Sequence, residues 1–280
     1  MRILCLHGYG TSPDVMKYQM SPLIKQCDPS WEFYYLPGNL KCPLDPGIAP
    51  AVPGPYLCYS ADLDPTSMRA AHALVKETFD NEGPFDGVFG FSQGAAVLLA
   101  YLLEQITIYP EKPLPIRFGI FCSSIPILAT DPAYYQPILS ILSLEDQQRL
   151  RSARDDQLDQ LKGPARVAIK SLVGAIDALE PVTRRSRSTF LDRQPLEIPC
   201  VLHPALYKAR LPIPTLHVRG RNEPSALKER SVLSESFCLP RWRRTFEHSA
   251  IHDIPRSMAD IKGMVSSMEW VIARSQLSKL

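Results

Sequence analysis

A single serine lies between two glycines in the stretch GFSQG, residues 90–94. The residues before it, DGVFGF, are short, apolar and aromatic, which is typical of a buried strand. The residues after it, QGAAVLLAYLLEQ, have helical spacing and strong helix formers. A serine at such a sharp strand-to-helix turn is the arrangement of a nucleophile elbow, where small neighbours leave room for the turn. We therefore predict that Ser92 is a nucleophile for acyl chemistry, and a tight structural turn is the alternative.

Such a serine needs a base within hydrogen-bond reach, because its hydroxyl is a weak nucleophile near neutral pH. Two of the six histidines precede the serine in the chain, and His217 falls inside the apolar strand TLHVR. His203 lies in a segment without predicted strands. The segment FEHSAIHDIP follows the last predicted strand and carries the other two. We predict His252 as the base, with His248 as the alternative.

The base needs a carboxylate to orient it, and the reaction needs two N–H donors for the negative oxygen. Glu223 follows the strand TLHVRG and is the predicted acid, although a helix-capping role would also explain it. Asp253 is a weaker candidate, since side chains of neighbouring residues seldom meet in this arrangement. For the oxyanion we predict the backbone N–H groups of Gln93 and of Tyr9, in HGYG. An ordinary glycine-rich strand exit is the alternative for HGYG.

The elements that must position these residues alternate between short apolar runs and amphipathic stretches. This alternation predicts an α/β fold in which a mostly parallel central sheet has helices on both faces. Residues 37–65 are rich in proline and glycine, so we predict a long irregular loop that either lines a pocket or only connects elements. The predicted strands are residues 2–6, 32–36, 87–91, 117–122, 215–219 and 244–247, and the predicted helices 15–27, 66–81, 93–105, 225–238 and 256–273.

Residues 124–212 interrupt the alternation with three amphipathic segments, AYYQPILSIL, LEDQQRLRSARDDQLDQL and ARVAIKSLVGAIDAL. We predict one domain over residues 1–280 with this insertion as a helical cap over the sheet end that carries Ser92. A satellite bundle that packs only on itself is the alternative. Apolar side chains cover most of the first segment's circumference, more than a surface helix requires. From it we predict Tyr134, Tyr135 and Ile138 as substrate-binding residues.

Composition excludes several other classes of protein. Of the 280 residues, 45% are hydrophobic and 21% charged, as in soluble globular proteins, and 31 basic against 29 acidic residues give no reason to expect nucleic acid. The seven cysteines form no CxxC pair, so we expect neither a metal nor a cofactor site. Their odd number and the missing export signal favour a cytoplasmic protein with reduced thiols. No stretch approaches the roughly 20 apolar residues of a membrane span.

Four segments together resemble the fungal serine hydrolase family of α/β-hydrolases: LHGYG with the later YQMSPL, GFSQGAAV, LHVRGRNEP and EHSAIHDIP. The resemblance covers most of the chain outside residues 124–212. It implies Ser92 as nucleophile, His252 as general base and Glu223 at the acid position. The family usually has aspartate where this chain has Glu223, and often paired glycines where it has Ala250 and Ile251.

The resemblance also implies a function, because similar members include thioesterases that release polyketide chains from carrier domains, and esterases of small acyl substrates. We expect a serine acyl hydrolase of secondary metabolism that releases an acyl or polyketide chain from an acyl carrier domain of a polyketide synthase. The basic runs RRSR (184–187) and RWRR (241–244) are candidates for contact with an acidic carrier. The alternatives are a carboxylesterase of small free esters, an acyl-transferring cyclase and a non-catalytic ligand-binding protein.

Overall fold

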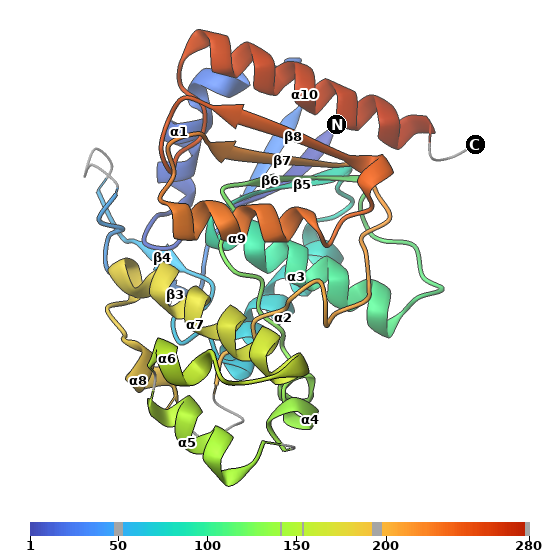
Figure 1. Ribbon diagram of the computed structural model, residues 1–280. Helices are drawn as coiled ribbons and strands as arrows, with labels where there is room; N and C mark the ends of the chain where they lie inside the picture. The colour runs from blue at the N-terminus through green and yellow to red at the C-terminus, as the bar shows by residue number, and fades with distance from the viewer. Residues whose placement is uncertain (48–52, 141, 153, 192–197, 278–280) are drawn as a thin grey trace.

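A six-stranded sheet forms the centre of the protein in a computed structural model, which describes residues 1–47, 53–140, 142–152, 154–191 and 198–277 (Figure 1). All neighbouring strands are parallel, in the order β2-β1-β5-β6-β7-β8. The six predicted apolar runs are these six strands. Their bounds are β1 Arg2–Leu6, β2 Glu32–Leu36, β5 Gly87–Phe91, β6 Phe118–Cys122, β7 Thr215–Gly220 and β8 Arg243–His248.

Helices cover both faces of this sheet, as the alternation of the sequence predicts. Alternate residues of β1 enter different cores, because successive side chains of a strand point to opposite faces. Ile3 and Cys5 pack with the helices of one face, and Leu4 and Leu6 with those of the other. The first face carries α1 (Pro13–Ile24) and α10 (Met258–Leu277), and the second carries α2 (Pro65–Glu82), α3 (Gln93–Ile108) and α9 (Ser225–Glu235) (Figure 1).

Among the described residues, no helix is long and apolar enough to cross a membrane.

The predicted loop over residues 37–65 contains a short antiparallel pair, β3 (Leu40–Lys41) and β4 (Leu57–Cys58). This pair holds the segment that follows β1, because Gly10 donates its N–H to the carbonyl of Leu57 at 3.1 Å. The N–H of Leu57 in turn donates to the carbonyl of Thr11 at 2.7 Å. The segment around Tyr9 is therefore fixed from two sides, by β1 and by β4. Residues 48–52 lie outside the described residues.

The insertion is helical, but the bounds predicted for its first two segments are wrong. In place of one helix over AYYQPILSIL, a 3-10 turn (η1, Pro132–Tyr134) is followed by the short helix α4 (Gln136–Leu139). Pro137 explains the break, since it has no N–H for a continuing helix and its ring clashes with the preceding turn. Residue 141 of this segment lies outside the described residues. The remaining helices are α5 Leu144–Ser152, α6 Asp155–Leu158, α7 Gly163–Thr183 and α8 Arg187–Leu191.

The described part of the insertion packs on the body of the protein. Leu128 and Val201 form an antiparallel bridge where the insertion leaves and rejoins the body. Leu172 and Ile176 of α7 are buried in the same hydrophobic cluster as Leu102 of α3. The helix α7 is therefore held by the core beneath it as well as by its neighbours in the insertion.

Candidate active site

Ser92 occupies a strained turn at the carboxyl end of β5. Its backbone has φ 51° and ψ −115°, a conformation with positive φ that side-chain-bearing residues rarely adopt. Its N–H donates to the carbonyl of Cys122 at 2.9 Å, which ties the turn to the end of β6. Helix α3 begins at the next residue, and a Cβ added to Gly94 would lie 2.2 Å from the carbonyl oxygen of Leu6. The second glycine of GFSQG therefore lets the helix start close against β1.

His252 and Glu223 meet Ser92 from the loops that follow β8 and β7. The Nε2 atom of His252 lies 3.0 Å from the Oγ atom of Ser92. The Nδ1 atom of the same ring lies 3.1 Å from Oε1 of Glu223. The loop that carries His252 crosses the end of β7, where a Cβ on Gly220 would lie 1.7 Å from the carbonyl oxygen of Ile251. The crossing is possible because residue 220 is glycine.

The side chains of Glu223 and His252 differ in exposure. The side chain of Glu223 is only 1% exposed, whereas that of His252 is 22% exposed. The second oxygen of Glu223, Oε2, has no hydrogen-bond partner among the described residues. A buried carboxylate on Nδ1 holds that nitrogen protonated and leaves Nε2 free to accept a proton from the serine hydroxyl. The side chain of glutamate thus reaches the imidazole at 3.1 Å.

The other acidic and imidazole groups considered from the sequence lie in different surroundings. His248 is fully buried at the end of β8, and neither ring nitrogen has a partner in the part of the chain that the structure describes. Asp253 accepts hydrogen bonds from Gln19 at 3.1 Å and from Arg256 at 2.7 Å, away from the imidazole. The structure therefore brings His252 to Ser92 and leaves both alternatives outside the contact.

Two backbone N–H groups lie beside Ser92 with no acceptor among the described residues, those of Tyr9 and Gln93. Gln93 is the first residue of α3, where backbone N–H groups have no partner within the helix. Both residues line the same cavity as Ser92. Donors that stabilise an oxyanion need free N–H groups at the reacting serine, and the assignment of Tyr9 and Gln93 to this role stays a prediction.

A network of buried groups, missed by the sequence analysis, braces these two donors. The side chain of Gln93 accepts from the N–H of Tyr59 at 2.9 Å and donates to the carbonyl of Ser60 at 2.6 Å. The hydroxyl of Tyr59 accepts from the N–H of His7 at 3.0 Å and donates to the carbonyl of Leu36 at 2.8 Å. Burial lowers the pKa of His7 to about 4, so its ring is neutral near pH 7. The network joins the elbow, β4 and the end of β1 into one unit.

The cavity at Ser92 has a volume of about 350 Å³ and a mostly apolar lining. The end of α7 forms one wall, with Ala178, Leu179 and Val182. The start of α9 forms another, with Ala226 and Leu227. Such a site holds an apolar group by excluding water from it, with a few polar atoms to fix its orientation.

The FSH1 serine hydrolase family model matches residues 1–264 of the chain. The chain belongs to the FSH1 family of serine hydrolases. "Serine hydrolase cnsH" of Penicillium expansum is 44% identical over 239 residues, which cover 85% of this chain and 98% of that protein. "Esterase alnB" of Emericella nidulans is 34% identical over 285 residues, which cover 98% of each chain.

A solved structure, the monoacylglycerol lipase of Paleococcus ferrophilus, covers 98% of this chain and 94% of its own at a TM-score of 0.51 and 13% identity. Together with the parallel sheet, this likeness shows the α/β-hydrolase fold in the FSH1 chain.

Tyr134, Tyr135 and Ile138, which the sequence predicts as substrate-binding residues, lie elsewhere than the cavity at Ser92 in this FSH1 hydrolase. Among the described residues that line the cavity at Ser92, these three are absent. Tyr134 lines a separate cavity beside His72. The hydroxyl of Tyr135 lies 3.0 Å from the carbonyl oxygen of Val201, and Ile138 packs against the main core. In this part of the insertion the hydrogen bonds of the Tyr135 hydroxyl join segments of the insertion, and α7 supplies a wall of the cavity at Ser92.

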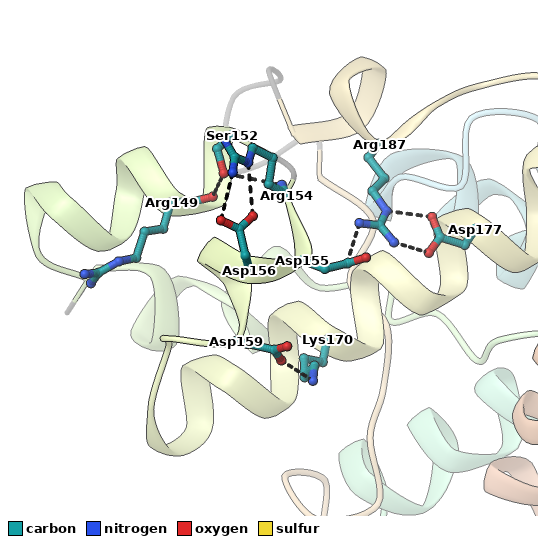
Figure 2. A network of polar contacts seen from close by, with 9 residues as sticks. All are labelled: Arg149, Ser152, Arg154, Asp155, Asp156, Asp159, Lys170, Asp177 and Arg187. Carbon is teal, nitrogen blue, oxygen red and sulfur yellow. Dashed lines mark hydrogen bonds and ion pairs between the residues drawn. The ribbon is translucent and has the colours of Figure 1, made fainter.

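One carboxylate of that wall, Asp177, is held by an arginine of the insertion. Arg187 donates from Nε to Oδ1 of Asp177 at 2.7 Å and from Nη2 to Oδ2 at 2.5 Å (Figure 2). The same guanidinium donates to Asp155 of α6 at 2.6 Å. This pairing keeps both oxygens of Asp177 engaged and ties α6, α7 and the first residue of α8 together.

Proposed function

We propose that this member of the FSH1 family hydrolyses esters or thioesters of an uncharged acyl group through an acyl-enzyme. Ser92 is the nucleophile, His252 the general base and Glu223 the group that orients it. The observation that carries the proposal is the continuous contact from the serine hydroxyl to the imidazole and on to the buried carboxylate, at 3.0 and 3.1 Å, beside an apolar cavity. The printed names of the relatives, a serine hydrolase and an esterase, agree with it.

The reaction proceeds in two halves. Nε2 of His252 takes the proton as Oγ of Ser92 bonds to the acyl carbon, and the N–H groups of Tyr9 and Gln93 bind the resulting oxyanion. The intermediate collapses, and the imidazolium gives its proton to the departing oxygen or sulfur, which leaves Ser92 acylated. A water molecule then loses a proton to His252 and attacks the acyl carbon. Collapse of this second intermediate releases the carboxylic acid and returns the proton to Ser92.

Within this function we propose a thioesterase that releases an acyl or polyketide chain from a carrier. The apolar cavity supports it, because each methylene buried there contributes about 0.8 kcal/mol of binding. The two basic runs do not add support. Arg185 pairs with Asp62 at 2.6 Å, and Arg187 is engaged by two carboxylates. Arg243 and Arg244 begin β8, at the opposite end of the strand from the loop that carries His252.

Labelling with a fluorophosphonate, which reacts with activated serines, tests the catalytic assignment. We expect the wild-type chain to label and both Ser92→Ala and His252→Ala to lose labelling and ester turnover, with unchanged circular dichroism. Loss of His252 should reduce kcat by at least about 10³-fold, since removing the base of a triad costs that much or more. Equal labelling of wild type and Ser92→Ala would show that another group reacts.

A matched pair of substrates, one acyl thioester and one oxygen ester of the same acyl group, separates the thioesterase from the carboxylesterase. We expect a higher kcat/KM for the thioester. A preference for the oxygen ester would assign the protein to the carboxylesterase class while leaving the serine mechanism intact.

A further inference from the structure

A second cavity, of about 280 Å³, lies between α7 and α9 and has a basic lining. Its polar residues are Arg166, Lys170 and Ser171 of α7, Arg230 of α9, and His203 from the segment that leads back to β7. The hydrolytic mechanism uses none of them. Their positive charges gather on one side of the insertion, although the chain as a whole is nearly neutral.

Arg230 is the most enclosed cation of this cavity. Its side chain is 13% exposed, and its Nε atom is buried without a hydrogen-bond partner among the described residues. The guanidinium lies against α7, where a Cβ on Gly174 would be 2.8 Å from Nη2. The exposed side chain of Glu229 contacts the guanidinium, with 3.5 Å between Oε2 of Glu229 and Nη2 of Arg230. A buried N–H of a charged group without an acceptor is costly, so the site favours an anion that supplies one.

The other cations are only partly neutralised. Lys170 pairs with Asp159, as Figure 2 shows, and Arg166 lies 3.6 Å from the same carboxylate. Within the described part of the chain, the ion pairs of these three cations involve only Asp159 and Glu229, which leaves an excess of one positive charge among these five groups.

His203 adds a neutral donor. Its Nδ1 atom accepts a hydrogen bond from the N–H of Ala205 at 3.1 Å, so Nε2 carries the proton of the neutral ring. Burial and the nearby charge of Arg230 lower the pKa of this imidazole, which favours the neutral form. Together with the hydroxyl of Ser171, the cavity offers donors of several kinds from three segments.

The basic cavity lies along the same pair of helices as the cavity at Ser92. Lys170 and Ser171 are seven residues before Asp177 and Ala178 of the first cavity, about 10 Å along α7. On α9, Arg230 is one turn beyond Leu227, which lines the first cavity. The two cavities therefore lie about two turns apart on α7 and about one turn apart on α9, within the length of an extended thioester substrate.

We propose that the cavity lined by Arg166, Lys170, Ser171, His203 and Arg230 binds a phosphate group on the thiol portion of an acyl thioester substrate. The inference rests on the proposed function and names the substrate class more closely. A phosphate fits these donors better than a carboxylate, because it offers three or more acceptor oxygens and up to two charges to guanidinium, ammonium and hydroxyl groups. A free phosphorylated thiol presents a phosphate monoester and a carrier-bound one a phosphodiester, and both offer anionic oxygens to these donors.

Two thioesters of one acyl group test the proposal, one on pantetheine and one on 4′-phosphopantetheine, which differ only by the phosphate. We expect wild type to favour the phosphorylated substrate about tenfold in kcat/KM, mainly through KM. In Arg230→Met, which keeps the length of the side chain and removes its charge, we expect this ratio to fall to about one. Lys170→Gln changes a half-exposed position and should lower the ratio less. It is the second variant, used if Arg230→Met does not fold.

Arg241→Met is the matched control, because Arg241 lies over the ring of Trp242 just before β8, away from both cavities. It should leave the ratio unchanged. A wild-type ratio near one would overturn the proposal, as would an equal fall for both substrates in Arg230→Met. Comparing the free phosphorylated thioester with the same acyl group on a carrier protein identifies the source of the phosphate.

Calorimetric titration of Ser92→Ala with 4′-phosphopantetheine, and with pantetheine as reference, measures the phosphate site without turnover. Binding that needs the phosphate and Arg230 would support the site even if the hydrolytic assignment failed. Equal heats for the two ligands would contradict it.

Discussion

Glu223 contacts His252 at 3.1 Å through a glutamate side chain, where the resemblance described from the sequence implies an aspartate. Its side chain is almost fully enclosed, so the extra methylene is accommodated within the protein and does not push the carboxylate into solvent. The geometry at this position therefore depends on the length of the side chain as much as on its charge.

This dependence predicts the order of two variants. Glu223→Asp withdraws the carboxylate from the imidazole by about one C–C bond, and we expect kcat/KM on a short ester to fall 10- to 100-fold, as for a displacement of about 1 Å in an active site. Glu223→Gln keeps the length but removes the charge, and we expect about 10⁴-fold, as for an amide in place of a triad carboxylate. Steady-state kinetics measures both. If the glutamine variant were the more active of the two, Glu223 would not be the orienting acid.

At the scale of single residues, the sequence was informative where local context fixes a side chain. Ser92, His252 and Glu223 each follow an apolar strand, and parallel strands deliver such positions to one edge of the sheet, where the structure brings them together. The brace between Gln93 and Tyr59 was not predictable in this way, since it joins residues 34 positions apart through one amide.

At the scale of elements, α7 shows how a cap can define a binding site. Its middle is buried in the main core, and its last two turns form a wall of the cavity at Ser92. The helical period of residues 165–179 was legible in the sequence. The sequence did not indicate which of the three insertion segments reaches the serine. Apolar residues that pack within the protein have the same pattern as apolar residues that contact a ligand.

Because α7 forms a wall of the cavity, we expect residues of this wall to limit the length of the acyl group that the cavity accepts. In Val182→Trp the larger ring fills part of the cavity, so long acyl groups should lose affinity, about fourfold for each methylene that no longer fits. We expect kcat/KM for a dodecanoyl ester to fall at least tenfold more than for an acetyl ester, measured on p-nitrophenyl esters. Val232→Trp, on an exposed part of α9, is the control and should leave the ratio unchanged. A uniform loss on both esters would argue against a gauge at this position.

At the scale of the whole molecule, buried imidazoles couple folding to pH. Burial lowers the pKa of His7 to about 4 and that of His217 to about 3, from an ordinary value of 6.5. Below pH 6.5 these imidazoles therefore bind protons in the unfolded chain but stay neutral in the folded chain. The resulting stability is fully present above pH 6.5 and is lost as the pH falls toward the folded values.

We expect the free energy of unfolding to fall by up to about 2 kcal/mol per buried imidazole between pH 6.5 and 5. Urea unfolding at several pH values measures it, in a window that lies above the ordinary pKa values of aspartate and glutamate. His217→Leu should flatten this slope, since it removes one of the groups. A slope that does not change in the variant would mean that other groups set the pH dependence.

The parallel sheet and both layers of helices were predictable from the alternation of apolar runs and amphipathic stretches, since strands buried on two faces leave a continuous signal, but the order of the strands was not. The bounds of the short helices could not be predicted in this way, because prolines such as Pro137 divide a segment whose periodicity predicts one helix.

The packing of α7 against α9 also limits what protein engineering can do with this scaffold. We expect that the insertion cannot be exchanged between relatives as an independent unit to change the substrate specificity. A chimera would place foreign side chains against the native face of α9, and each poorly filled site of leucine size costs about 2–5 kcal/mol. Exchanging specificity through α7 would thus require redesign of the partner helix at the same time.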